Sequence, residues 1–194
     1  MKQGKRMKIG NISLSSLFDF FQSKKSGDLH HNIKKNIESG KMTKPNSCYS
    51  VALFIAETDG EISSRVRKSV QDTLNNGYSP MYREMMNIGE YTLNHFLDIP
   101  YGKSGFVNFI NKNGELCHTA YIKASSEGSV YYHANYSCID KFITDKCGFD
   151  CMGLIDKTSI IFYIINGDIS SSLTEFMQEN QWRAAFCPVS FLRK

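Results

Sequence analysis

The order of the predicted elements places this chain in the α+β class. Helical patterns fill most of the chain up to about residue 100, strand patterns dominate from 105 to 165, and one more helical pattern follows. A chain of 194 residues with 41% hydrophobic residues can bury one sizeable core. We therefore expect a single domain over residues 41–194, with N-terminal helices packed on a C-terminal antiparallel sheet.

Residues 1–40 are predicted to form a polar leader before this domain, either docked on it or loose. The segment is rich in Lys, Ser, Asn and Gly, and its apolar residues cluster between Leu14 and Phe21 with the spacing of a short amphipathic helix. The basic start is followed by Ser, Asn and Asp and lacks a small-residue cleavage site, so a conventional signal peptide is not expected.

Three helices are expected after Pro45. The first begins at Cys48, with Asn46 or Ser47 as its N-cap, and continues as an apolar run. The second spans much of 59–77, where apolar residues recur every four positions and Asn-Asn-Gly ends the pattern. The third is predicted over 79–99, because Ser-Pro opens it and Pro100 follows it.

The remaining elements are mostly strands. Three short strands are expected within 105–137, separated by Asn-Lys-Asn-Gly and Ser-Ser-Glu-Gly turns. "SIIFYII" at 159–165 predicts a further strand, and 139–145 predicts a short helix. "ISSSLTEFMQEN" at 169–180 predicts the closing helix.

Charge and composition exclude several partner classes. Ten basic and three acidic residues fall in the first 44, while the rest of the chain has no basic excess, so no nucleic-acid partner is expected. No apolar run reaches the roughly 18 residues of a membrane span. The six cysteines are irregularly spaced and read as reduced thiols, without the paired spacing of a zinc site, so no metal is expected.

The hairpin around Ser125–Gly128 brings polar residues together. If residues 124 and 129 flank its loop, paired positions sum to 253, which puts His118 opposite Asn135 and Ala120 opposite His133. All four side chains then share one face of the sheet. Asn135 is therefore the first candidate to orient the His118 imidazole, and His133 is the alternative.

Cys48 is the candidate nucleophile for such a histidine. A cysteine in the first turn of a helix lies where peptide dipoles and open N–H groups favour an anion, which lowers the thiol pKa. The backbone N–H of Cys48 and the side chain of Asn46 would form an oxyanion hole. Cys48 as a small buried residue and His118 as a core histidine remain the alternative interpretation.

The three segments together resemble the papain-like cysteine peptidases, especially their small bacterial effector and toxin branches. The resemblance lies in "NSCYSVAL", "CHTAYI" and "VYYHANYS", from residue 46 to about 137. Those relatives often carry Asp-Pro-Asn where this chain has His133-Ala134-Asn135. The resemblance implies a papain-like fold and a Cys48, His118 and Asn135 site, with His133 in place of the usual aspartate.

The implied function is that of a secreted bacterial effector: a thiol hydrolase, either a cysteine protease or a glutamine deamidase, acting on a host protein. This chemistry needs no cofactor. The leader would then be a secretion signal, with a secretion chaperone as a candidate partner, and the protein would act in the host cytosol. Two alternatives stay open: a non-catalytic binding module on a degenerate papain-like fold, and a peptidoglycan amidase.

Overall fold

The computed structural model describes most of the chain after the first 23 residues. The described residues are 24–41, 47–75, 91–125, 128–134, 139, 141–142, 145, 152–154 and 160–193. Within them the fold is α+β, as the order of elements predicts, with helices packed on an antiparallel sheet.

The sheet has seven strands among the described residues, in the order β1-β7-β2-β3-β4-β6-β5. All neighbouring pairs are antiparallel. The strands are β1 (Tyr91–Leu93), β2 (Ser104–Ile110), β3 (Leu116–Ser125), β4 (Gly128–Ala134), β5 (Met152–Leu154), β6 (Ile160–Ile165) and β7 (Arg183–Pro188).

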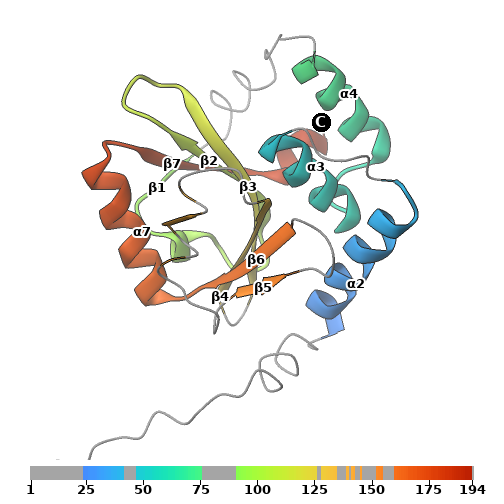
Figure 1. Cartoon of the computed structure of the whole chain (residues 1–194), viewed down its shortest axis with the longest axis horizontal. Helices are drawn as coiled ribbons and strands as arrows, with labels where there is room; N and C mark the ends of the chain where they lie inside the picture. The colour runs from blue at the N-terminus through green and yellow to red at the C-terminus, as the bar shows by residue number, and fades with distance from the viewer. Residues whose placement is uncertain are drawn as a thin grey trace, which may run out of the picture.

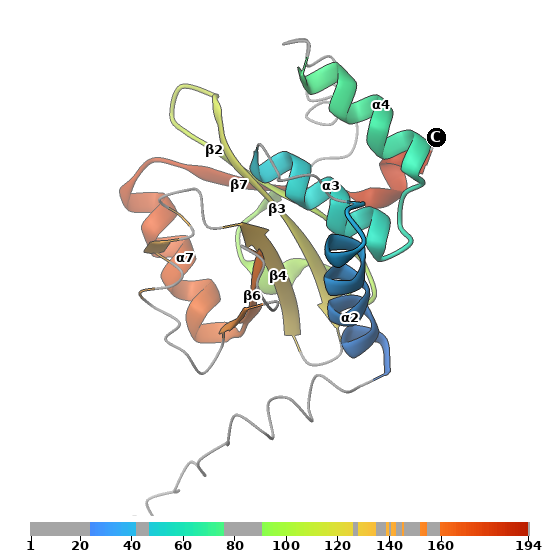
Figure 2. The ribbon, with the colours of Figure 1, turned by 45° about the vertical axis from the view of Figure 1, so that its right-hand side comes forward.

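Helices cover both faces of this sheet (Figure 1). On one side lie α2 (Lys24–Glu38), α3 (Cys48–Thr58) and α4 (Ser64–Asn75), and on the other lies α7 (Gly167–Glu179). Figure 2 shows the same arrangement after rotation, with α3 crossing the strands and α2 beside it. Two 3-10 turns, η1 (Phe96–Asp98) and η3 (Val189–Arg193), complete the described elements.

Each face of the sheet has its own core because strand side chains alternate between faces. Phe106, Tyr121 and Tyr132 face the α3 side, where they pack with the apolar residues of α3 and α2. Phe109 and Tyr163 face the α7 side and pack with residues such as Leu173. The largest apolar contribution to the first core comes from α3, whose residues 51–56 are all buried.

Residues 24–38, which lie within the predicted leader, pack against the rest of the fold. In α2, Leu29 and Ile33 are buried in the core beneath α3. His30 stacks on Phe162 of β6, with ring centroids 4.2 Å apart. The helix is therefore fixed to the sheet as well as to α3, and the predicted apolar cluster at 14–21 lies outside the described residues.

The helix predicted over 79–99 is wrong in its described part. Tyr91–Leu93 is a strand that pairs with β7, from Tyr91↔Phe186 to Leu93↔Ala184, and η1 follows it. The sequence pattern did not predict β7 either. Tertiary pairing between two short segments about 90 residues apart overrides the local helical spacing here, because Tyr91–Leu93 gains its backbone hydrogen-bond partners from β7, which is itself held by β2.

Candidate active site around Cys48 and His118

Cys48 is the first residue of α3, as the sequence predicts. Ser47 is the N-cap: its backbone is extended, and its side chain accepts a hydrogen bond from the Ser50 N–H at 3.3 Å. The Ser50 hydroxyl in turn donates to Gln71 Oε1 of α4 at 2.7 Å. The helix start is thus held by its own cap and by the neighbouring helix, which fixes the position of Cys48.

The side chains of Cys48 and His118 lie side by side, although the sequence separates them widely. Burial of the Cys48 thiol raises its pKa, but a hydrogen bond and the charge of His118 lower it. Backbone hydrogen bonds at Thr119 and Tyr49 act in the same direction, and the net result is a pKa below that of an ordinary thiol. Cys48 as a residue is only partly buried, and its lowered pKa makes the thiolate easier to form than in an ordinary cysteine.

A bulge in β3 sets the position of His118. Phe109 of β2 pairs with His118, but the next residue, Ile110, pairs with Leu116, so Cys117 is the extra residue. Bulges of this kind redirect neighbouring side chains and are frequent next to active sites. His118 is 1% exposed, and its ring stacks on Phe109 with centroids 5.8 Å apart.

The hairpin register that the sequence predicts is confirmed in the described part of the ladder. Tyr121 pairs with Tyr132, and the pairing continues without a shift to Ser125 and Gly128, so paired positions sum to 253. Asn135, the predicted orienting residue, and Asn46, the predicted oxyanion donor, lie outside the described residues. Their roles stay predictions.

His133 lies on the same side of the sheet as His118, as the register predicts. The two rings meet edge to face with centroids 6.2 Å apart. A direct hydrogen bond of about 3 Å between two imidazole nitrogens would bring the ring centers closer than this. His133 instead stacks on Tyr163, at 5.1 Å and an interplanar angle of 7°. In this arrangement His133 packs near His118 and does not hold it directly.

A polar pair beside Cys48 was missed in the sequence. The Thr119 hydroxyl donates to Asn108 Oδ1 at 2.8 Å, and both residues are fully buried on the face that α3 covers. The Asn108 Nδ2 group has no hydrogen-bond partner among the described residues. The signal in the sequence is an asparagine inside the otherwise apolar strand "SGFVNFI". This pair fixes β2 and β3 next to the Thr119 backbone that contacts Cys48.

Metal sites and membrane-spanning helices are not found among the described residues. Among them, no group of three His, Cys, Asp or Glu side chains is arranged to hold a metal ion. The helices of the described part are all too short or too polar to cross a membrane. Cys138, Cys147 and Cys151 lie outside the described residues.

Comparison with known families gives one match. The model of a family described as Domain of unknown function (DUF8038) matches residues 25–194. The chain belongs to this family. The match begins within α2 and includes every described element after it, so α2 is part of the family domain rather than an appendage. No curated protein and no solved structure matches the chain.

Proposed function

We propose that this chain is a thiol hydrolase of papain-like type, a cysteine protease or a glutamine deamidase. The observation that carries the proposal is the contact between Cys48 and His118, which lowers the pKa of the thiol at the start of a helix. A cysteine activated by an adjacent histidine is the recurring arrangement of nucleophilic thiol enzymes.

The reaction follows from the roles of these two side chains. The Cys48 thiolate attacks an acyl or carboxamide carbon, and the backbone N–H groups at the start of α3 stabilise the oxyanion. His118 then protonates the leaving amine or ammonia, which leaves a thioester on Cys48. Water hydrolyses the thioester, and the proton from water passes through His118 back to the thiol.

The finer parts of the proposal rest on the sequence. Three parts rest on the family resemblance: secretion as a bacterial effector, a secretion chaperone, and action on a host protein in the host cytosol. The sequence adds cysteines of the reduced type, no expected signal peptide and a polar leader rich in Ser and Asn. The orientation of His118 by Asn135 and the oxyanion role of Asn46 also remain predictions from the sequence. A peptidoglycan amidase would use the same two side chains and differs only in substrate.

A non-catalytic binding module is the second candidate. The observation that favours it is the burial of His118, whose side chain is 1% exposed and packed against Phe109 and His133. A module of this kind would keep the fold and lose the reactive thiolate. The reactivity of Cys48 therefore separates the two candidates.

The test is the pH dependence of Cys48 alkylation by iodoacetamide, read by peptide mass spectrometry. An ordinary thiol with a pKa of about 8.5 is only about 1% thiolate at pH 6.5, so a hydrolase should alkylate Cys48 about tenfold faster there than the partly exposed Cys117. Cys117 provides a control within the same molecule. Equal rates at the two cysteines would exclude the hydrolase and leave the binding module.

Two variants connect the reactivity to the pair. The variants are His118→Ala and His118→Gln, of which the second fills more of the space of the imidazole. In both, Cys48 should no longer be alkylated faster than Cys117 at pH 6.5, provided circular dichroism shows the native fold. Cys48 reactivity that is unchanged in a folded His118 variant would contradict the proposed pairing. The wild-type pH profile remains decisive if both variants unfold.

A further inference from the structure

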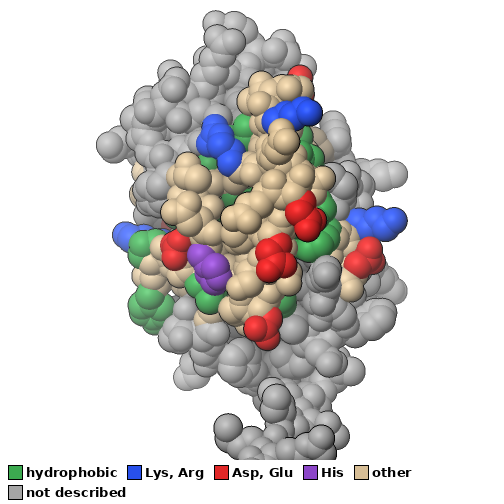
Figure 3. All heavy atoms as spheres, turned by 90° about the vertical axis from the view of Figure 1, so that its left-hand side faces the viewer, with side chains coloured by type: hydrophobic (Ala, Val, Ile, Leu, Met, Phe, Trp, Pro, Cys, Tyr) green, Lys and Arg blue, Asp and Glu red, His purple; other side chains and the backbone are tan. Residues whose placement is uncertain are grey.

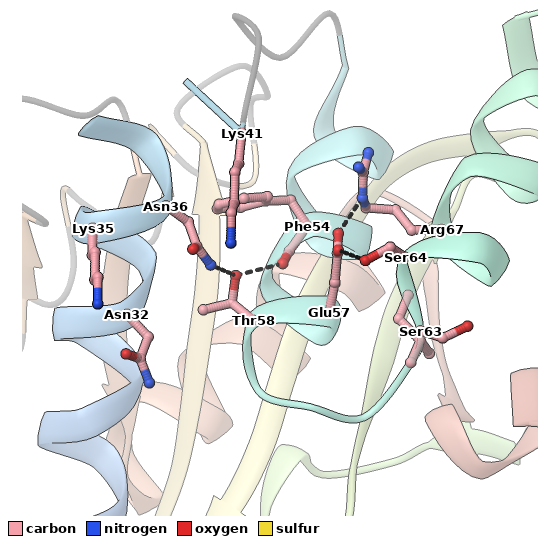
Figure 4. Close-up of a pocket in the computed structure, with 11 residues that line it drawn as sticks. Asn32, Lys35, Asn36, Lys41, Phe54, Glu57, Thr58, Ser63, Ser64 and Arg67 are labelled. Carbon is pink, nitrogen blue, oxygen red and sulfur yellow. Dashed lines mark hydrogen bonds and ion pairs between the residues drawn. The ribbon is translucent and has the colours of Figure 1, made fainter. Parts of the chain in front are cut away.

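An open polar groove lies between α2, α3 and α4, away from Cys48. Its volume is about 760 Å³, within the range of about 300–1,000 Å³ of small-ligand pockets. Figure 4 shows its walls: Lys35 and Asn36 come from α2, Glu57 and Thr58 from α3, and Arg67 from α4. The lining is mainly polar, which distinguishes this groove from an apolar docking surface.

One wall of the groove is fixed by hydrogen bonds. Asn36 Nδ2 donates to Thr58 Oγ1 at 3.2 Å, and Thr58 Oγ1 donates to the Phe54 carbonyl at 2.9 Å. The first bond joins α2 to α3, and the second lies within α3 and holds the Thr58 side chain in place. The shape therefore exists before any ligand arrives, which reduces the ordering cost of binding.

The side chains that line the groove carry more positive than negative charge. Its acidic residue, Glu57, is paired with Arg67 and also accepts from the Ser64 hydroxyl. Lys35 and Lys41 are exposed, and neither makes an ion pair with a described residue. Two ammonium groups are therefore left to attract an anion into a groove that Asn and Ser side chains also line.

The α7 side of the molecule carries several exposed carboxylates. Figure 3 shows the face that α7 covers, with acidic side chains across its middle and Lys or Arg side chains around them. Asp168, Glu175 and Glu179 of α7 are all exposed. The carboxylates of α7 disfavour an acidic partner at that helix, whereas Lys35 and Lys41 favour it in the groove.

We propose that this groove binds an acidic segment of a polypeptide, and that this segment belongs to the substrate of Cys48. The second half of this statement rests on the proposed hydrolase function. Glu57 follows Cys48 by nine residues of α3, which corresponds to about 14 Å along the helix axis. An extended chain covers that distance in about four residues, so the acidic residues would lie at least that far from the reacting carbonyl.

A peptide suits the groove better than a small anion. The cavity is large for an inorganic phosphate, and its lining includes ammonium groups as well as amide and hydroxyl groups. Carboxylates bind the first kind of group, and backbone carbonyls accept from the second.

The first experiment measures binding without chemistry. A fluorescein-labelled peptide rich in Glu is titrated with full-length Cys48→Ala, and fluorescence anisotropy is recorded at low and at moderate salt. The affinity should exceed that of an uncharged peptide of equal length and should fall as salt rises. The double variant Lys35→Ala/Lys41→Ala in the same background should weaken binding about fivefold.

The matched control is Lys68→Ala/Lys112→Ala, which removes two exposed lysines that do not line the groove. It changes the net charge by the same amount and should alter the affinity less than about twofold. An equal loss in both double variants, or no preference for the acidic peptide, would overturn the proposal. Displacement of the peptide by inorganic phosphate at equal ionic strength would also overturn it, because the groove would then take any small anion.

Failure of this proposal can be told apart from failure of the hydrolase proposal. Peptide binding to the groove with an unreactive Cys48 supports the groove and excludes hydrolysis. A reactive Cys48 with no peptide binding supports the hydrolase and excludes the groove.

Discussion

The thiol of Cys48, at the start of α3, lies beside the imidazole of His118, which is in β3. His118 lowers the pKa of Cys48, although burial alone would raise it. The helix cap at Ser47 fixes one partner, and the bulge at Cys117 fixes the other. The pair depends on both local features being present at once.

The first prediction concerns the residue that orients His118. His133→Phe keeps the ring that stacks on Tyr163, so it should change the rate of Cys48 alkylation less than about threefold, since His133 does not contact His118 by a direct hydrogen bond. Asn135→Ala should slow alkylation more, if Asn135 is the orienting residue that the sequence predicts. A larger loss in His133→Phe than in Asn135→Ala would reverse this assignment.

The second prediction concerns Asp59, which follows the C-terminal end of α3. Its carboxylate accepts from the Tyr121 hydroxyl and from Lys123 Nζ at 2.7 Å, and its side chain is 8% exposed. Asp59→Ala leaves a buried hydroxyl and an ammonium without this acceptor, which should lower the free energy of unfolding by about 3 kcal/mol. Urea denaturation measures the change.

The matched control for Asp59 is Glu115→Ala. The Glu115 carboxylate is exposed and accepts from Asn111 Nδ2 within a turn, so its loss should stay within about 0.5 kcal/mol. Equal stabilities of the two variants would show that Asp59 does not join α3 to β3.

The third prediction concerns Gly105 in β2. An added Cβ would overlap the Cys187 carbonyl oxygen of β7 and lie 2.8 Å from the Phe186 ring. Because a backbone atom of the paired strand cannot move aside, Gly105→Ala should cost about 3 kcal/mol. Gly167→Ala is the control, since nothing lies within 4 Å and the site begins α7. Thermal unfolding of the two variants should differ clearly, and a similar melting temperature would contradict the close strand approach.

The fourth prediction concerns the buried ring of His30. Burial lowers its pKa from 6.5 to about 4, so the neutral form is favoured in the folded state. Between these two values the unfolded chain binds more protons, so the stability that is present above about pH 6.5 declines as the pH falls toward 4. From about pH 7 to pH 5 this residue should remove about 2 kcal/mol.

The measurement is urea denaturation at both pH values, in wild type and in His30→Phe. The variant keeps an aromatic ring against Phe162 but cannot titrate, so its stability should fall less with pH. The same pH dependence in both proteins would show that other groups cause it.

Some features of this protein follow from the sequence itself. The start of α3 at Cys48 and the register of the β3–β4 hairpin are encoded by neighbouring residues: a serine cap before an apolar run, and a short turn between two strands. Residues within one turn of a helix or across one tight turn interact whatever the rest of the chain does. For this reason both could be predicted.

Other features were decided only by the tertiary structure. The helical spacing before Pro100 was overridden by the pairing of β1 with β7, and β7 itself was not predicted because its partners, β1 and β2, lie about 80 to 90 residues earlier. The packing of α2 depends on contacts with distant parts of the chain: Ile33 packs in the core with α3, and His30 stacks on Phe162 of β6. The same holds for the site: the sequence predicts Cys48 and His118 as separate residues, but only the packing of α3 on β3 brings the thiol and the imidazole together.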